Sequence, residues 1–83
     1  MTITVRYFAS LREALGPSEA VALEAPTTLG ALRDRLVASS DAHAAALGRG
    51  RAVRAALNQA IADESAPVSD GAEVAFFPPV TGG

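Results

Sequence analysis

The sequence predicts an α+β domain in which one main helix lies across one face of a small mixed sheet. Residues 2–8 alternate between apolar and polar side chains, which is typical of a strand with one buried face. Residues 29–37 carry leucines at helical spacing, and residues 73–77 form an apolar run that predicts a last strand. Strands, a long helix and further strands in this order favour a helix packed on a sheet.

Length and composition exclude several classes of function. The chain has 83 residues, enough for one domain that buries about 60–65% of its unfolded surface. The formal net charge is −2 and the basic residues are scattered arginines, so we expect no nucleic-acid partner. No apolar run approaches the roughly 20 residues that cross a bilayer, and the N-terminus lacks the pattern of a secretion signal. We therefore expect a cytoplasmic protein without a membrane partner. The absence of cysteine and lysine excludes thiol and side-chain amine nucleophiles.

The first strand has one face that we expect in the core and one that carries an unexpected aromatic. The core side chains of this strand are those of Ile3, Val5 and Tyr7. Phe8 lies on the opposite, otherwise polar face. A short helix follows over residues 10–15, with Ser10 as its N-cap and Glu13 completing a capping box. Residues 19–24 form a weaker strand, which we expect to pair with the first as a hairpin.

Thr28 is expected to cap the main helix. The apolar residues at i, i+3, i+7 and i+8 are Leu29, Leu32, Leu36 and Val37, whereas the three residues 33–35 are charged and are expected to face water. Residues 39–41 interrupt the helix, and Asp41 is expected to cap a further turn that ends at Leu47.

Residues 52–62 fit two structures. Val53, Leu57 and Ile61 recur at helical spacing, and the alanines between them favour a helix. The same residues also fit two short strands joined by a turn at Asn58-Gln59. Local propensity alone favours the helix. Residues 63–67 are expected to form a loop, and residues 69–71 a turn into the last strand.

Parity separates the two aromatics of the last strand. Neighbouring strand residues point to opposite faces, so Phe76 and Phe77 cannot both enter the core. Val74 shares a face with Phe76, which places these two inside and leaves Phe77 outside, exposed with Phe8 beside the chain end. If the first and last strands lie side by side, the tail leaves at the edge of the sheet. We therefore divide the chain into a folded domain, 1–77, and a tail, 78–83.

The tail combines stiffness with a thin tip. Pro78 and Pro79 exclude a helix and restrict the exit from the domain, whereas Gly82 and Gly83 have no side chains. A trailing Gly-Gly alone would indicate a cloning remnant. Here the pair directly continues an aromatic-proline run, which indicates a terminal carboxylate that is presented to the pocket of another protein.

No conventional catalytic or metal site assembles from the sequence. His43 is the only histidine and lies in an alanine-rich segment, so we expect a structural role at the surface or half-buried, and no metal site. Asp63 and Glu64 are adjacent loop carboxylates, which is typical of a solvated turn. The chain is expected to bind no cofactor and to act as a substrate for other proteins. Whether it counts as an enzyme stays open.

Residues 70–83, Asp-Gly-Ala-Glu-Val-Ala-Phe-Phe-Pro-Pro-Val-Thr-Gly-Gly, resemble the C-terminal signature of the sulfur-carrier small subunits of molybdopterin synthase, in the MoaD/ThiS family. Tyr7-Phe8-Ala9 and Leu57-Asn58-Gln59 extend the resemblance over the whole chain. It implies a ubiquitin-like β-grasp fold with a protruding C-terminal tail, in which residues 52–62 are strand and turn. Gly30 within the main helix departs from the family pattern.

The resemblance also implies a function. An ATP-dependent adenylating and sulfurating enzyme would activate the terminal Gly83, and sulfur from a persulfide donor would convert it to a thiocarboxylate. The large catalytic subunit of a heterotetrameric synthase would then pass this sulfur to cyclic pyranopterin monophosphate, forming the molybdopterin dithiolene. ATP would be consumed by the partner, not held by this chain. Alternatives are a sulfur carrier for thiamine or cysteine synthesis, or a ubiquitin-like protein modifier.

The resemblance assigns roles to individual residues. Gly83, with Gly82 before it, would carry the reactive carbonyl. The residues that would contact the partners are Phe8, Ile61, Phe77, Pro78, Pro79, Val80 and Thr81.

Overall fold

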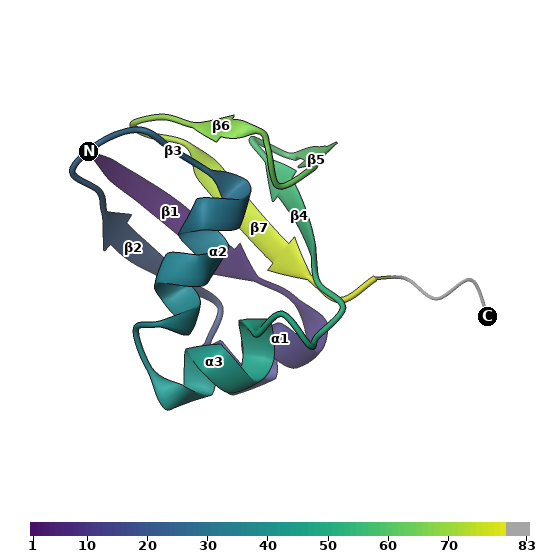
Figure 1. Cartoon of the computed structure of the whole chain (residues 1–83). Coiled ribbons are helices and arrows are strands. Elements are labelled where there is room, and N and C mark those ends of the chain that lie inside the picture. Colours follow the sequence, from purple (N-terminus) through teal and green to yellow (C-terminus); the bar gives the residue numbers. More distant parts are fainter. Residues whose placement is uncertain (80–83) are drawn as a thin grey trace.

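The computed structural model describes residues 1–79 (Figure 1). The expectations for Val80, Thr81, Gly82 and Gly83 lie outside these residues. Along the chain the elements are β1 (Thr2–Tyr7), α1 (Ala9–Leu15), β2 (Ser18–Ala22), β3 (Thr27–Thr28), α2 (Leu29–Val37), α3 (Asp41–Leu47), β4 (Arg54–Leu57), β5 (Ala60–Ala62), β6 (Pro67–Val68) and β7 (Glu73–Phe77).

The main sheet has the strand order β2-β1-β7-β4-β5. β1 and β7, the first and last strands, run parallel side by side, and the other neighbours are antiparallel. α2 lies across one face of this mixed sheet (Figure 1). The predicted α+β class and the ubiquitin-like β-grasp are confirmed. The expectation that the tail leaves at the edge of the sheet is wrong, because β7 has a partner strand on each side.

The core lies between α2 and the sheet and has the predicted faces. The strand residues that enter it are Ile3, Val5, Tyr7, Val74 and Phe76, each at most 2% exposed. Leu29, Leu32 and Leu36 of α2 pack against them. Parity in β7 is therefore as predicted. The hairpin of β1 and β2 is also confirmed, with Val21 opposite Ile3.

α1 begins earlier than predicted, and the expectation that Ser10 caps it is wrong. Ala9 adopts a positive φ of 52°, so the chain turns into the helix immediately after β1. Phe8 is therefore the N-cap, and its carbonyl accepts hydrogen bonds from the N–H groups of Leu11 and Arg12. Ser10 already lies inside the first turn. The helix ends at Leu15, as predicted, and Gly16 is its C-cap.

The caps of the other two helices are side-chain hydroxyls. The Oγ1 of Thr28 accepts from the Ala31 N–H at 3.2 Å, as predicted for α2. In α3 the cap is Ser40, whose Oγ accepts from the His43 N–H at 3.0 Å. The expectation that Asp41 caps this helix is wrong by one position, because Asp41 is its first helical residue.

Residues 54–62 form a β-hairpin, so the helix that local propensity favours is wrong. Asn58 and Gln59, with φ of 49° and 72°, make the turn between β4 and β5. Ala55 pairs with Phe76 across β4 and β7 and is buried. Pairing with the central strand therefore outweighs the helix preference of alanine. A further departure is β6, which begins inside the expected loop 63–67 and pairs with β3.

Arg33 is buried, although the sequence pattern placed it in water. It is 5% exposed, whereas its neighbours Asp34 and Arg35 are exposed as predicted. Its guanidinium donates to the carbonyl oxygens of Leu47, Gly48 and Arg51, at 2.7, 2.9 and 3.0 Å. These bonds tie the end of α3 and the following loop to α2.

Candidate docking surface and tail exit

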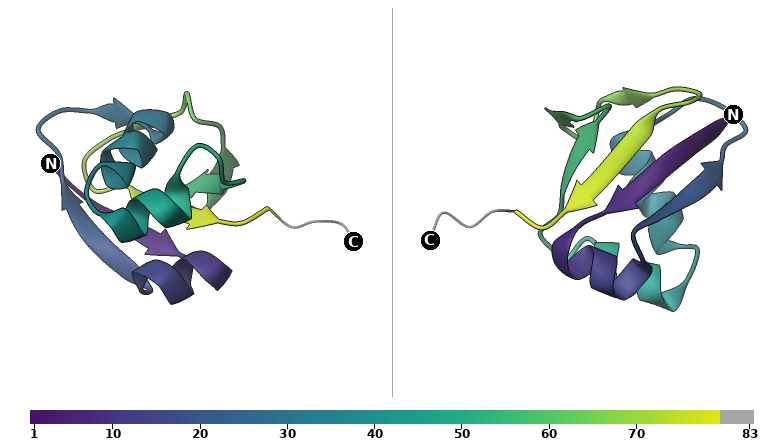
Figure 2. Two further views of the ribbon diagram at one scale, coloured as in Figure 1. Left: turned by 60° about the horizontal axis from the view of Figure 1, so that its bottom comes forward. Right: turned by 180° about the vertical axis from the view of Figure 1, so that it is seen from behind.

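No helix within residues 1–79 covers one of the two faces of the main sheet. α2 lies across the opposite face, and the view from behind shows strands in front of it (Figure 2, right). Strand alternation and the pairing register determine which side chains of β1, β4, β5 and β7 point to this side. We call this surface the open face and define it by Arg6, Phe8, Arg54, Ala56, Ile61, Glu73, Ala75 and Phe77.

The open face contains Phe8, Ile61 and Phe77, which are far apart along the chain. In one cross-strand row, Ile61 lies opposite Ala56, which lies opposite Ala75. Phe77 lies two residues beyond Ala75 on the same side of β7, and the Phe8 N–H donates to the Phe76 carbonyl beside it. The alanines leave a low apolar floor between the larger side chains.

Exposure differs among these residues. Ile61 is 64% exposed and Phe8 is 38% exposed, which is high for large apolar side chains. Phe77 is half-buried and so less exposed than the sequence predicts, and Pro78 and Pro79 are also half-buried. An apolar group of this kind on a sheet face without a helix is available to a partner.

Charged groups border the apolar part of the open face. The Arg6 guanidinium lies 5.3 Å from the centre of the Phe8 ring, and it forms an ion pair with Glu73 at 3.6 Å. Arg54 pairs with Phe77 across β4 and β7. An apolar centre with a charged rim is the usual composition of a protein–protein interface.

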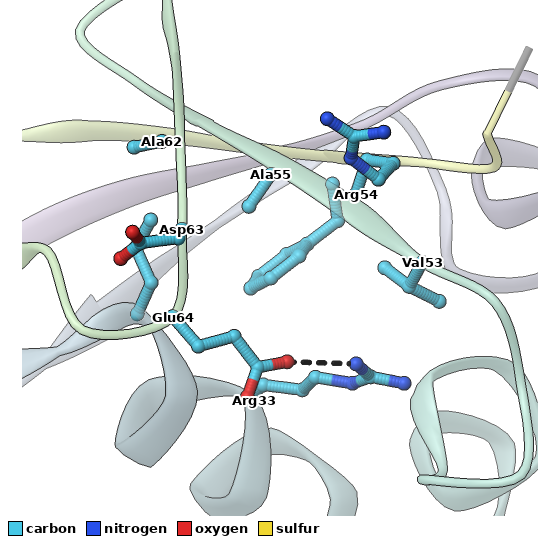
Figure 3. A pocket seen from close by; sticks show the side chains of 9 residues that line it. Arg33, Val53, Arg54, Ala55, Ala62, Asp63 and Glu64 are labelled. Carbon is cyan, nitrogen blue, oxygen red and sulfur yellow. Dashed lines mark hydrogen bonds and ion pairs between the residues drawn. The ribbon is translucent and has the colours of Figure 1, made fainter.

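A small pocket lies on the other side of β4 (Figure 3). It has a volume of about 210 Å³ and is lined by Phe76, Ala55 and Arg33, among others. Ligand pockets usually measure about 300–1,000 Å³. Two of its charged groups are also already paired, because Arg33 Nη1 donates to Glu64 Oε2 at 3.0 Å. Hydrogen bonds from Arg49, and then from Arg33, hold the pKa of Glu64 below its usual value. The pocket is therefore too small for a typical ligand, and the ion pair that lines it stabilises the fold.

His43 has the structural role that the sequence predicts. It is half-buried, and its Nε2 lies 2.7 Å from Glu19 Oε2. The same oxygen accepts a hydrogen bond from Tyr7 Oη at 2.7 Å, so the carboxylate joins β1, β2 and α3. Burial, and then the bond to Glu19, raises the pKa of Tyr7, which stays protonated. No sequence pattern indicated this cluster, because its members are joined only by the fold.

Neither a cluster of metal ligands nor a membrane-spanning helix is found within residues 1–79. No three His, Asp or Glu side chains in this range come close enough to hold a metal ion. None of the helices between Thr2 and Pro79 has the length and apolar character needed to span a membrane.

Comparisons with known proteins agree with the fold. The model of the ThiS family matches residues 5–83. The chain is 48% identical to the molybdopterin synthase sulfur carrier subunit of Escherichia coli (strain K12), over 98% of this chain and 99% of that protein. The structure resembles small archaeal modifier protein 1 of Haloferax volcanii, with TM-score 0.75 and 27% identity, over 95% and 98% of the two chains. It also resembles a chain in the complex of subunits 1 and 2 of the molybdopterin-converting factor of Helicobacter pylori 26695, with TM-score 0.69, 26% identity and 100% coverage of both chains.

Proposed function

The chain belongs to the ThiS family, and from this premise we propose that it carries sulfur for molybdopterin synthesis on the carbonyl carbon of Gly83. The observation that carries the proposal is the full-length similarity to a carrier subunit of molybdopterin synthase, together with a family match that extends through Gly82 and Gly83. The open face beside the exit of β7 supplies a surface by which other proteins hold the domain while they act on its end. ATP drives the first step, which places the proposed reaction in the cytoplasm.

The carboxylate of Gly83 must be activated first, because oxide is a poor leaving group. A carboxylate oxygen attacks the α-phosphorus of ATP in the activating enzyme, releasing pyrophosphate and forming an acyl adenylate. The terminal sulfur of a persulfide then attacks the carbonyl carbon and releases AMP. A second thiol attacks the other sulfur of the resulting acyl disulfide, which leaves a thiocarboxylate on Gly83 and a disulfide on the donor. The hard substitution is divided into easier steps.

The second half of the cycle takes place in the large catalytic subunit. The thiocarboxylate sulfur attacks a carbon of cyclic pyranopterin monophosphate and displaces an oxygen substituent from that carbon, which forms a thioester. Water then hydrolyses the thioester, which returns the carboxylate of Gly83 and leaves the sulfur on the pterin. A dithiolene contains two sulfurs, so each product needs two deliveries. A complex of the two subunits is known for the similar molybdopterin-converting factor of Helicobacter pylori, which supports a partner of this kind.

The tail residues fit narrow access to such a partner. A segment of six residues, from Pro78 to Gly83, spans at most about 20 Å when extended. Prolines reduce the entropy that is lost when a segment is held in one conformation. Any side chain at Gly82 or Gly83 would widen the tip. We propose that the tail enters a narrow channel in the partner, where Val80 and Thr81 contact the channel walls. Phe8, Ile61 and Phe77 form the apolar contact outside this channel.

Deletion of Gly83 tests the proposal. The purified chain is incubated with the activating enzyme, ATP and a persulfide donor, and intact mass reports replacement of one oxygen by sulfur. We expect conversion of the wild type, none for the deletion or for Gly83→Ala, and the same melting temperature for all three. A thiocarboxylate on the deletion variant would refute the role of Gly83.

A second candidate is a ubiquitin-like protein modifier, and the similarity to small archaeal modifier protein 1 favours it. The chain has no lysine, so it cannot form side-chain-linked polymers of itself, although it can be joined to other proteins. A search for conjugates in lysate distinguishes this candidate, since a carrier leaves none. Rescue of a molybdopterin-deficient strain, and not of a thiamine- or cysteine-requiring one, distinguishes the pathways.

A further inference from the structure

A groove lies beside the exit of β7, away from the open face. α1 and α3 lie side by side near the end of β7 (Figure 2, left), and the groove of about 450 Å³ is bounded by both helices and by Pro78. The residues that line it are Ser10, Leu11, Ala14, Ala42, Ala45, Ala46, Arg51, Ala52 and Pro78.

The groove is mainly apolar and has low walls, because alanines make most of its lining. Ala14 of α1 and Ala42 and Ala45 of α3 all line the groove, and all three are exposed. With side chains this small on both helices, no described residue of the chain fills the space between them. A ligand with several polar groups would find few partners here, since Ser10 and Arg51 supply the polar side chains of the lining.

Arg51 gives the groove a positive rim. Its Nε donates to the Ala45 carbonyl at 3.0 Å, which holds the guanidinium over the edge of α3. None of the ion pairs among residues 1–79 involves Arg51, whereas Arg33 and Arg49 nearby are both paired with Glu64. The charge of Arg51 is therefore available to a group from outside, and the complementary group is a carboxylate.

The position of Pro78 links the groove to the tail. Pro78 is the first residue of the tail and also forms one wall of the groove. A protein that encloses the tail up to its root must therefore lie against the groove as well. This step rests on the proposed function, because only a chain whose end enters another protein has such a neighbour.

We propose that the groove receives an apolar side chain from the rim of the protein that takes up the tail, followed by a carboxylate that pairs with Arg51. The groove would then fix the rotation of the domain about its tail, while the open face supplies most of the buried apolar area. Two contacts, one on each side of the exit, fix the direction in which the tail enters the channel. A single contact would leave the domain free to rotate.

The test measures the dissociation constant for the large subunit of molybdopterin synthase by calorimetry, with the full-length chain. Ala45→Trp fills the groove, and Arg51→Glu reverses the rim charge. Ala44→Trp is the matched control, because Ala44 is exposed on the same helix but does not line the groove. We expect Ala45→Trp and Arg51→Glu to weaken binding by about tenfold or more and the control to change it by less than about twofold.

Each outcome decides the matter. Equal binding by Ala45→Trp and Ala44→Trp, with wild-type binding intact, overturns the groove proposal and leaves the proposed function standing. Absence of binding by the wild type overturns both. If Ala45→Trp lowers the melting temperature, Arg51→Glu is decisive in its place, because the Arg51 side chain is exposed and its hydrogen bond to the Ala45 carbonyl is an exposed one. If the groove instead binds a second copy, the wild type forms a dimer that Ala45→Trp dissociates, and the proposal is overturned.

Discussion

Arg33 and Glu64 form an ion pair at 3.0 Å in which one partner is almost completely buried and the other is half exposed. The remaining donors of Arg33 bind carbonyl oxygens around the end of α3. No buried side-chain nitrogen or oxygen among residues 1–79 lacks a hydrogen-bond partner. The guanidinium therefore acts as the polar centre of this side of the fold, joining α2 to two loops.

Replacing Arg33 should destabilise the domain strongly. Arg33→Met leaves the carbonyls of Leu47, Gly48 and Arg51 without their donor, and we expect the free energy of unfolding to fall by about 2–4 kcal/mol. Arg33→Lys should restore little of this, because an ammonium cannot reach several separated acceptors in one plane. Urea unfolding measures the change.

Arg35→Ala is the control for this prediction. Arg35 lies two positions further along the same helix and makes an exposed hydrogen bond to the Ala22 carbonyl. Its loss should cost less than about 1 kcal/mol. Equal destabilisation by the two substitutions would contradict the central role of Arg33.

The burial of Arg33 marks the limit of what could be predicted from the sequence. The spacing of apolar residues identified the buried faces of β1, α2 and β7, because residues on a buried face recur with the period of the strand or helix. A charged residue next to Leu32 reads as solvated unless its acceptors are known, and these lie 14 to 18 residues away along the chain. Long-range pairing of this kind leaves no local pattern.

The β4–β5 hairpin shows the same limit at the level of the backbone. Residues 52–62 are rich in alanine, so local propensity favoured a helix, and only the resemblance to a known family pointed to strands. Pairing of β4 with the central strand β7 determines the outcome. At the candidate site, strand parity predicted which aromatic leaves the core, whereas only the resemblance to a known family grouped Ile61 with Phe8 and Phe77.

The turn of this hairpin is expected to improve with glycine. Gln59 has φ of 72°, in the left-handed region that costs a residue with a Cβ. Gln59→Gly should raise stability by about 0.5–1 kcal/mol, and Gln59→Ala should give no gain. Asn58 is left in place, because its Oδ1 accepts from the Glu73 N–H at 2.9 Å. Thermal unfolding of the two variants is the measurement, and a gain with alanine would contradict the turn geometry.

The Glu19 carboxylate should contribute to acid sensitivity. Partial burial acts to raise its pKa, but the hydrogen bonds from His43 and Tyr7 and the attraction of His43 outweigh this, so the pKa lies below its ordinary value. A group with a lowered pKa stabilises the fold above its unfolded pKa, and this contribution is lost as the pH falls through the folded value. We expect Glu19→Gln to be less stable than the wild type at pH 7, with the difference shrinking below about pH 4. The melting temperatures of both proteins are measured across this pH range. A difference between them that stays constant with pH would contradict this expectation.

Phe76 and Phe77 should separate folding from partner binding. Phe76 is 2% exposed in the core, so Phe76→Ala should lower stability by about 3–5 kcal/mol. Phe77 lies half-buried on the open face, and Phe77→Ala should cost less than about 1.5 kcal/mol while weakening binding of the large subunit by about tenfold. Melting temperature and calorimetric titration are measured on the same preparations. If Phe77→Ala reduced stability more than it reduced binding, Phe77 would belong to the core and the open face would lose its central aromatic contact.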